Sequence, residues 1–331
     1  MVKKVIKKIY EKIYGIPYDW MKYYKKMAKR NYLFSAASKN EESIEWVVTK
    51  LRILTHEIDK GLAMKNPRPG FGREKINFMM HLLEKYLEFN QLNYEYDAYL
   101  DAVEILEKYI ENKDNYMLDI SMIDLKKYPR DYSKLNNRLA SNKDYEKCGS
   151  DVFDFKQFAQ NRHSIRAYKD DTVISDKMFE EIIKVARTAP SACNRQSIHA
   201  FLINDRELAK KVLEIQGGNR GFYGADNCII VMADMNSYWY DGEMNTAFID
   251  GGLFMMNLIY SLKYYGLDSC PLIWDDYSER RDKINEIINI ESNMLIIGIL
   301  TVGNAEDDAK ILCSPRKDTI NIIVKEGGYS S

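Results

Sequence analysis

The sequence changes character near residue 150, and this change constrains the fold more than any other feature. Before it, apolar residues recur at intervals of three and four, which is the spacing of amphipathic helices. After it, short apolar runs of strand length alternate with helical segments. We therefore predict a helical domain over residues 1–150 and a mixed domain over residues 151–331. The clearest helical repeats are Trp46, Leu51, Leu54 and Ile58, and later Leu100, Val103, Leu106 and Ile110.

Local signals place the individual elements. The prolines and glycines of residues 66–72 forbid a continuous helix there, and the polar, patternless residues 136–149 predict a linker. In the second half, helices are predicted over residues 176–188, opened by Ser175 as N-cap, and over residues 246–265, ended by Gly266. Strands are predicted over residues 199–204, 227–233, 294–302 and 319–325.

Composition excludes several classes of protein. Hydrophobic residues make up 46% and charged residues 29% of the 331, enough apolar material for a core and against a disordered chain. No apolar run approaches the roughly 18 residues that span a bilayer. The five cysteines are scattered and the four histidines form no HExxH, so neither a disulfide scaffold nor a metal site is expected. Free cysteines favour a reducing compartment, and we expect a cytoplasmic protein.

Positive charge gathers at the N-terminus although the net charge is only −1. Residues 1–30 hold ten Lys and Arg against two acids, but no nucleic-acid-binding module is present, so we expect no nucleic-acid partner. A Lys-rich amphipathic helix with interspersed aromatic residues suits peripheral contact with an anionic membrane. The alternative is that its apolar stripe packs on its own domain while the lysines face water, and the sequence leaves both open.

Nucleophilic machinery is absent: there is no GxSxG elbow, no P-loop and no kinase signature. Residues 217–224 are glycine-rich without the GxGxxG spacing and predict an ordinary turn. In residues 161–168, Arg162, Ser164 and Arg166 alternate, so an extended chain would point all three to one face, where they would suit a phosphate dianion. The alternative is a solvated basic strip.

A second polar segment, residues 189–196, directly follows the helix that Pro190 ends. Ser191, Asn194 and Gln196 supply hydroxyl and amide groups that suit the edge of a flat polar heterocycle. By itself the segment is also typical of any polar loop between a helix and a strand.

Together these segments resemble the FMN-dependent nitroreductase-like family over residues 155–325. The resemblance rests on RHSIRAY at residues 162–168, APSACNRQ at 189–196, the helix and turn from Asp250 to Pro271, IIGILTVG ending at Gly303, and the pair Pro315-Arg316. It implies an α+β, three-layer nitroreductase-like fold, here with a helical N-terminal extension. Residues 51–72 further resemble the leader of nitroreductase-like proteins associated with polysaccharide biosynthesis.

The resemblance assigns cofactor contacts to individual positions. One group holds the FMN phosphate and ribityl chain: Arg162, His163 through its backbone, Ser164, Arg166 and Arg316. A second reaches the flavin ring from the partner subunit: Pro190, Ser191, Ala192 and Asn194, with Gln196 beside them. A third lies at the ring edge or over the flavin face near N5: Asn219, Pro271, Leu272 and Ile273. Where many members have Glu-Gly, this chain has Ile273-Trp274, so Trp274 is predicted either as a lid or as a packing residue.

The implied activity is that of an NAD(P)H-dependent FMN oxidoreductase. Hydride passes from NADPH or NADH to flavin N5 and then to an unidentified small-molecule acceptor in a ping-pong scheme, so no side chain is expected to act as a catalytic acid, base or nucleophile. The resemblance also implies a homodimer formed through residues 246–265, with FMN at the interface and residues 319–325 adding a strand to the partner's sheet. An alternative is a redox-inactive flavin-binding or membrane-surface accessory protein of a polysaccharide pathway. In the leader, His56, Glu57 and Asp59, near Arg68, are predicted to line a pocket over the flavin; the alternative is that His56 and Asp59 are capping or surface groups.

Overall fold

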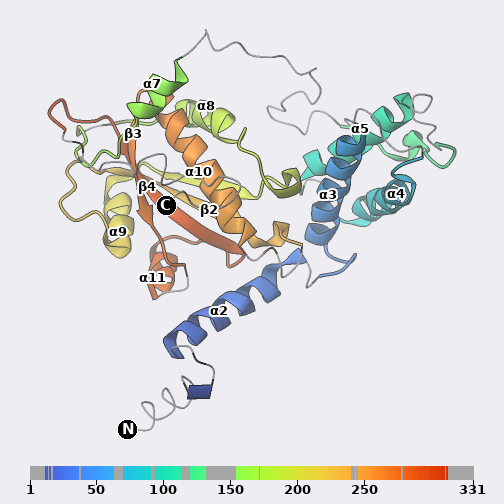
Figure 1. The fold of residues 1–331 in the computed structure, drawn as a ribbon, viewed down its shortest axis with the longest axis horizontal. Coiled ribbons are helices and arrows are strands. Elements are labelled where there is room, and N and C mark those ends of the chain that lie inside the picture. Colours follow the sequence, from blue (N-terminus) through green and yellow to red (C-terminus); the bar gives the residue numbers. More distant parts are fainter. Residues whose placement is uncertain are drawn as a thin grey trace, which may run out of the picture.

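The protein is described by a computed structural model (Figure 1). The described residues are 12–13, 15, 18–36, 39–62, 70–90, 94–112, 120–131, 154–170, 172–239, 243, 245–276, 279–309 and 311. Residues 1–11 of the predicted N-terminal helix, the linker over residues 136–149 and the strand over residues 319–325 lie outside these ranges. The fold class is α+β, as predicted: helices precede a mixed layer structure built around one sheet.

The N-terminal half is helical in its described part. It contains α2 (Tyr18–Phe34), α3 (Ile44–Leu62), α4 (Arg73–Glu88), α5 (Tyr96–Glu111) and a short 3₁₀ turn, η2 (Leu125–Lys127). Helices α3, α4 and α5 pack on one another around a hydrophobic cluster that includes Leu51, Leu82, Tyr99 and Leu106, all with no exposed surface. The predicted helices around residues 46–58 and 100–110 are confirmed, because their apolar residues face this cluster.

The second half is built on a four-stranded sheet in the order β1-β2-β4-β3. Strands β1 (Ile198–Ile203), β2 (Asn227–Asp234), β3 (Asp268–Ile273) and β4 (Met294–Gly303) are antiparallel to each neighbour. The predictions of β1, β2 and β4 are confirmed. Strand β3 was not predicted, because Asp268, Ser269 and Pro271 make it look like a turn; an edge position tolerates the proline.

Helices cover both faces of the sheet and make three layers (Figure 1). Helices α8 (Asp176–Ala186) and α10 (Thr246–Tyr264) pack on one face, and α9 (Arg206–Gln216) and α11 (Glu279–Ile287) on the other. Ser175 caps α8 as predicted, since its hydroxyl accepts from the N–H of Met178 at 3.2 Å. Helix α10 approaches the sheet closely at Gly251, where an added Cβ would lie 2.7 Å from Ile297. The short α7 (Phe155–Gln160) lies over α10 through contacts of Phe155 and Phe158 with Tyr260.

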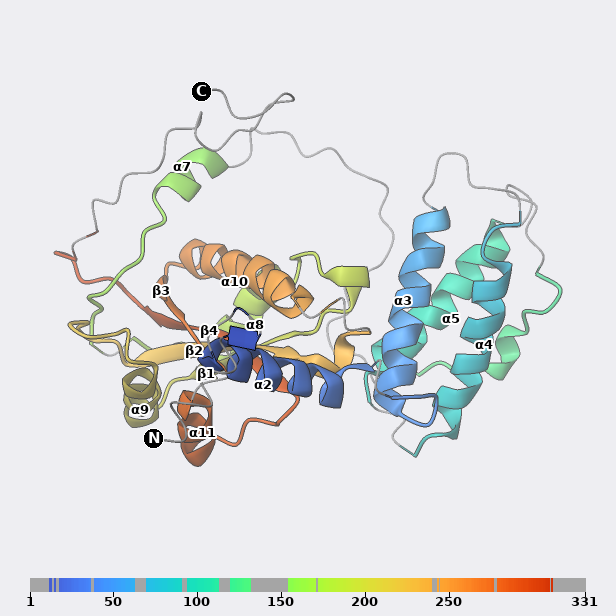
Figure 2. The same ribbon diagram turned by 60° about the horizontal axis from the view of Figure 1, so that its bottom comes forward.

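The N-terminal helices contact the second half through a few specific groups (Figure 2). On α2, Met27 is buried against a cluster that contains Met235 and Tyr238. Arg30 pairs with the buried carboxylate of Asp276 and donates to backbone carbonyls at the start of β4. At the end of α2, the hydroxyl of Ser35 and the N–H of Ala36 both donate to the carbonyl of Tyr238, at 2.9 and 2.7 Å.

Candidate functional site

The alternating segment predicted to bind phosphate lies along the outer edge of β3. Ser164 forms a bridge with Ser269, and the N–H of Ile165 donates to the Ser269 carbonyl at 3.1 Å. The buried Tyr168 anchors the segment, since its hydroxyl donates to the carbonyl of Ile165 at 2.7 Å and meets Thr301 Oγ1 at 2.8 Å. The segment therefore pairs with the edge of the sheet at Ser164 and Ile165.

The two arginines of this segment lie near enough to Cys270 to act on its thiol electrostatically. Burial raises the pKa of the Cys270 thiol, while the positive charges of Arg166 and Arg162 and a hydrogen bond from Ser164 lower it. Among the described residues, no carboxylate lies within 4 Å of either guanidinium, although other arginines of the protein are paired. We call Arg162, Ser164 and Arg166 the cradle. His163 lies between them and is half-buried, and Arg316 lies outside the described residues.

The predicted ring-edge and flavin-face residues lie beside the cradle. The N–H of Tyr223 donates to the Arg166 carbonyl at 3.0 Å, and the guanidinium of Arg166 lies 5.9 Å from the centre of the Phe222 ring. This places the turn that contains Asn219 next to the cradle, and residues 217–224 form a turn as predicted. The amide of Gln216 donates to the carbonyl of Ile273 at 2.8 Å, so the turn also meets the end of β3.

Ile273 and Trp274, at the end of β3, point in opposite directions. The side chain of Ile273 is 90% exposed, and Pro271 is also exposed, while Leu272 is buried. Trp274 is only 7% exposed; it packs among the residues of α9 and α11, and its indole N–H donates to Asp276 at 2.9 Å. Trp274 is therefore a packing residue, and the lid alternative is wrong.

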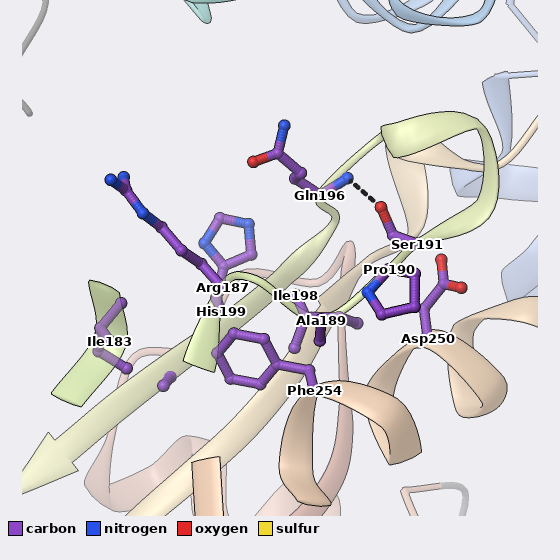
Figure 3. Close-up of a pocket in the computed structure, with 11 residues that line it drawn as sticks. Ile183, Arg187, Ala189, Pro190, Ser191, Gln196, Ile198, His199, Asp250 and Phe254 are labelled. Atoms are coloured by element: carbon purple, nitrogen blue, oxygen red, sulfur yellow. Dashed lines mark hydrogen bonds between the residues drawn. The ribbon is translucent and has the colours of Figure 1, made fainter. Parts of the chain in front are cut away.

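The second predicted segment forms a conformationally strained loop before β1. Three of the four described non-glycine residues with positive φ lie in it: Cys193 at 51°, Asn194 at 53° and Gln196 at 51°. Such conformations cost free energy and persist only where neighbouring contacts impose them, and they concentrate at functional sites. Ser191 helps to impose them, since its hydroxyl accepts from the N–H of Gln196 at 3.0 Å (Figure 3).

A buried ion pair holds the loop in place, and sequence reasoning missed it. Both terminal nitrogens of Arg195 lie 2.8 Å from the two carboxylate oxygens of Glu243. Arg195 also donates through Nε to the Ala192 carbonyl at 2.9 Å, and only 1% of its side chain is exposed. The carboxylate of Asp250, on α10, accepts a hydrogen bond from the N–H of Ala192 at 3.1 Å. Burial raises the pKa of Asp250, while the Ala192 N–H and the positive charge of Arg195 oppose that shift.

A cavity of about 340 Å³ opens between the loop, α8, β1 and α10. Figure 3 shows its lining: Pro190, Ser191 and Asp250 lie on one side, and Arg187, Gln196 and His199 on the other. Three of the predicted loop residues thus face one space. The leader acids do not, because Glu57 and Asp59 pair with Lys75 and Lys108 on neighbouring helices at 2.9 and 3.7 Å; these two are surface groups.

The cradle and the loop lie at diagonally opposite corners of the sheet. Ser164 lies beside Ser269 of β3, which pairs with Val302 of β4, and Val302 in turn pairs with Asn227 at the first end of β2. Ser197, at the end of the loop, lies instead beside Asp234 at the other end of β2. With about 4.8 Å between strands and about 3.3 Å per residue along them, the two sites are roughly 30 Å apart. Helix α10 supports this separation, since the part from Asp250, near the loop, to Tyr264, just before the turn into β3 near the cradle, is about 21 Å long.

Comparison with known proteins gives the family. The model of the nitroreductase family matches residues 159–219, which contain both the cradle and the loop. A protein of Archaeoglobus fulgidus named as an NADH dehydrogenase/NAD(P)H nitroreductase is 31% identical over 149 residues, covering 44% of this chain and 83% of its own length. The chain belongs to the nitroreductase family.

This nitroreductase-family chain is also similar to other proteins. A Bacillus subtilis protein named FMN reductase [NAD(P)H] is 32% identical over 76 residues, covering 23% of this chain and 30% of its own length. A nitroreductase-like protein of Streptococcus mutans, whose crystal structure is known, is 20% identical, with a TM-score of 0.46 over 52% of this chain and 98% of its own. The residues that the family model matches, 159–219, all lie within the second half of the chain.

Two absences hold for the described residues. No helix among them is both long enough and apolar enough to span a bilayer. Nor do the described residues contain a group of three or more His, Cys, Asp or Glu side chains arranged to hold a metal ion.

Proposed function

We propose that this nitroreductase-family protein is a homodimeric FMN oxidoreductase that takes hydride from NADPH or NADH and passes it to a small-molecule acceptor. One observation carries the proposal: the residues expected to hold the flavin phosphate and those expected to reach its ring lie at opposite ends of α10. A single protomer therefore cannot bring them to one flavin, whereas two protomers related by a twofold axis across α10 can.

The cradle fits the phosphate of FMN. Two guanidinium groups and a hydroxyl lie on one edge of the sheet, and no described carboxylate competes for them. Arginine presents a planar fork of donors that matches phosphate oxygens, and such charge-assisted hydrogen bonds are about twice as strong as neutral ones. We assign Arg162, Ser164 and Arg166 to the phosphate, with His163 and Arg316 completing the set.

The exposed face of α10 supports the dimer. An apolar stripe follows its helical repeat through Ile249, Leu253 and Met256 to Tyr260 and Tyr264; Ile249 and Tyr264 are 60% and 64% exposed. Between them, Gly252 leaves room for close approach, since a Cβ there would meet nothing within 4 Å. Antiparallel pairing of two such helices would set the loop of one protomer against the cradle of the other.

The chain's own residues would bind and orient the cofactor. FMN supplies the hydride acceptor and donor at N5. The loop of the partner would present Ser191, Asn194 and Gln196 to the ring edge, in the conformation that Arg195 fixes from behind. Asn219 would contact the same edge, and the backbone of residues 271–273 would cover the ring face. No described side chain needs to act as acid, base or nucleophile, because the cofactor carries the chemistry.

An absorbance spectrum of the purified protein, before and after anaerobic addition of NADPH or NADH, tests the proposal. Flavin bands that bleach would support it, and equilibrium sedimentation should then give two flavins per dimer. Bands that persist with both reductants would favour the redox-inactive alternative. A protein that takes up no added FMN would refute the proposal.

Two finer aspects rest on the N-terminal half. The resemblance of residues 51–72 supports an association with polysaccharide biosynthesis. On α2, Lys22, Lys25 and Lys29 are exposed beside Tyr24, which is 47% exposed, and this supports peripheral contact with an anionic membrane. Sedimentation with anionic liposomes at low and high salt tests the contact; protein that stays in the supernatant at low salt would exclude it.

A further inference from the structure

Lys50, on α3, lies in an aromatic setting at the junction of the two halves. Its ammonium is 4.3 Å from the centre of the Trp239 ring and 5.9 Å from that of Phe78. Trp46 is the third aromatic residue, with its ring centre 5.0 Å from that of Trp239 and 6.4 Å from that of Phe78. We call Trp46, Phe78 and Trp239 the frame. All four side chains are half-buried.

This ammonium has no acidic partner. Among the described residues, no carboxylate lies within 4 Å of Lys50, although its neighbour Lys75 pairs with Glu57 at 2.9 Å. Burial lowers the pKa of Lys50; Glu57 opposes this shift and Lys75 adds to it. A half-buried cation held only by ring faces gains modestly from cation–π attraction and retains strong affinity for an anion that enters beside it.

Covalent neighbours and hydrogen bonds connect this frame to the loop. The N–H of Trp239 donates to Glu243 at 2.6 Å, and the same carboxylate holds Arg195. One residue before Lys50, the hydroxyl of Thr49 donates to the Asn236 carbonyl at 3.3 Å. Helix α3 itself packs against the 3₁₀ turn Ala192–Asn194, which is the tip of the loop. The frame therefore lies beside the residues expected to meet the flavin ring.

We propose that Lys50, framed by Trp46, Phe78 and Trp239, binds an anionic group carried on a flat ring, and that the N-terminal helices thereby select the substrate of the flavin site. The inference rests on the proposed function for the identity of that site. The shared chemistry is a carboxylate or phosphate attached to a stacking ring. Such a group would come from an acidic aromatic acceptor or from the nicotinamide dinucleotide, and the experiment separates these sources.

The acceptor arm uses the flavin-loaded protein and two probes of the same shape, 4-nitrobenzoate and the neutral 4-nitrobenzamide. Lys50→Met should raise KM for the benzoate about tenfold or more and leave kcat and the KM for the amide within about twofold. Lys50→Arg keeps the charge and should restore most of the affinity. Lys85→Met on α4 is the matched control, because Lys85 pairs with Glu88 at 2.8 Å and should change neither probe.

The dinucleotide arm measures the dissociation constant of NADPH from the dependence of the flavin reduction rate on its concentration. A comparable charge-dependent loss in this arm alone would assign the anion to the dinucleotide. Equal effects on benzoate and amide with no change for NADPH, or no effect in either arm, would overturn the proposal, since Lys50 would then only join the two halves.

A third measurement keeps the inference independent of turnover. Quenching of tryptophan fluorescence reports direct binding, because two of the four tryptophans belong to the frame. If NAD(P)H fails to reduce the flavin, the proposed function fails; tighter binding of benzoate than amide, lost in Lys50→Met and kept in Lys50→Arg, would still establish the anion site. Lys50→Gln replaces the Met variant if the latter does not fold. Equal quenching by both probes in the wild-type protein would overturn the site itself.

Discussion

Removing Glu243 should destabilise the second half strongly, because it leaves the Arg195 guanidinium buried without its counter-charge. The pair is bidentate at 2.8 Å, and the side chains are 1% and 12% exposed, so water cannot replace the carboxylate. Breaking such a pair from one side costs about 3–5 kcal/mol. We expect Glu243→Ala to lower the free energy of unfolding by that amount, a large part of a typical stability of about 5–15 kcal/mol.

Urea unfolding followed by tryptophan fluorescence and circular dichroism would measure the change. The decisive comparison is the double variant Arg195→Met/Glu243→Ala, which removes both charges and fills part of the space. It should be less destabilised than Glu243→Ala alone, with a coupling energy of about 2 kcal/mol or more. Glu207→Ala is the control, since Glu207 pairs with Lys210 at an exposed position and should cost about 0–0.5 kcal/mol. A Glu243→Ala protein within about 1 kcal/mol of wild type, or additive effects in the double variant, would refute the reasoning.

Three further predictions follow from the cradle, the α10 face and the loop. Arg162→Ala should weaken FMN binding about ten- to a hundredfold by removing a charge-assisted phosphate contact, measured by flavin fluorescence titration; unchanged affinity would refute the cradle. Gly252→Leu should give a monomer with little flavin by sedimentation while Gly252→Ala stays dimeric, since an added Cβ meets nothing within 4 Å in the protomer and only the larger side chain should block the close approach of a second helix; a flavin-bound dimer of the Leu variant would exclude α10 as the interface. Asp250→Asn should be more stable than wild type at pH 7, because the raised pKa of Asp250 means that folding disfavours its ionised form. This advantage should vanish as the pH falls toward the ordinary pKa of 3.8, where the wild-type carboxyl becomes protonated. Urea unfolding at several pH values measures the difference in stability, and a difference that does not change with pH would contradict the reasoning.

Much of the architecture was accessible from the sequence because its signals were local. Helices α3, α4 and α5 repeat their apolar residues at one helical period, and β2 and β4 are continuous apolar runs with both faces covered. Helices α9 and α11 were missed, since charged residues on their outer faces dilute the apolar stripe; α11, for example, contains Arg280, Asp282 and Lys283. Strand β3 was missed for a different reason: its polar residues are tolerated only because β4 and the cradle segment flank it.

In the candidate site, too, some features could be predicted from local sequence and others could not. The alternation of Arg162, Ser164 and Arg166 is a local pattern, and their common edge could be predicted once the segment was taken as extended. The importance of Arg195 could not, because a charged residue in a polar loop resembles a surface group until Glu243, 48 residues later, is known to lie against it. Trp274 likewise gave no local sign of direction, and only the packing of α9 and α11 shows that it turns inward.

The placement of cradle and loop at opposite ends of α10 has a genetic consequence. In the proposed dimer, each flavin site would draw its cradle from one subunit and its loop from the other. A protomer carrying a damaged cradle, mixed with a protomer carrying a damaged loop, would then assemble a heterodimer in which one site holds both defects and the other holds none. Two alleles that are each inactive alone should therefore complement one another when co-expressed, up to about a quarter of wild-type activity if the subunits associate at random.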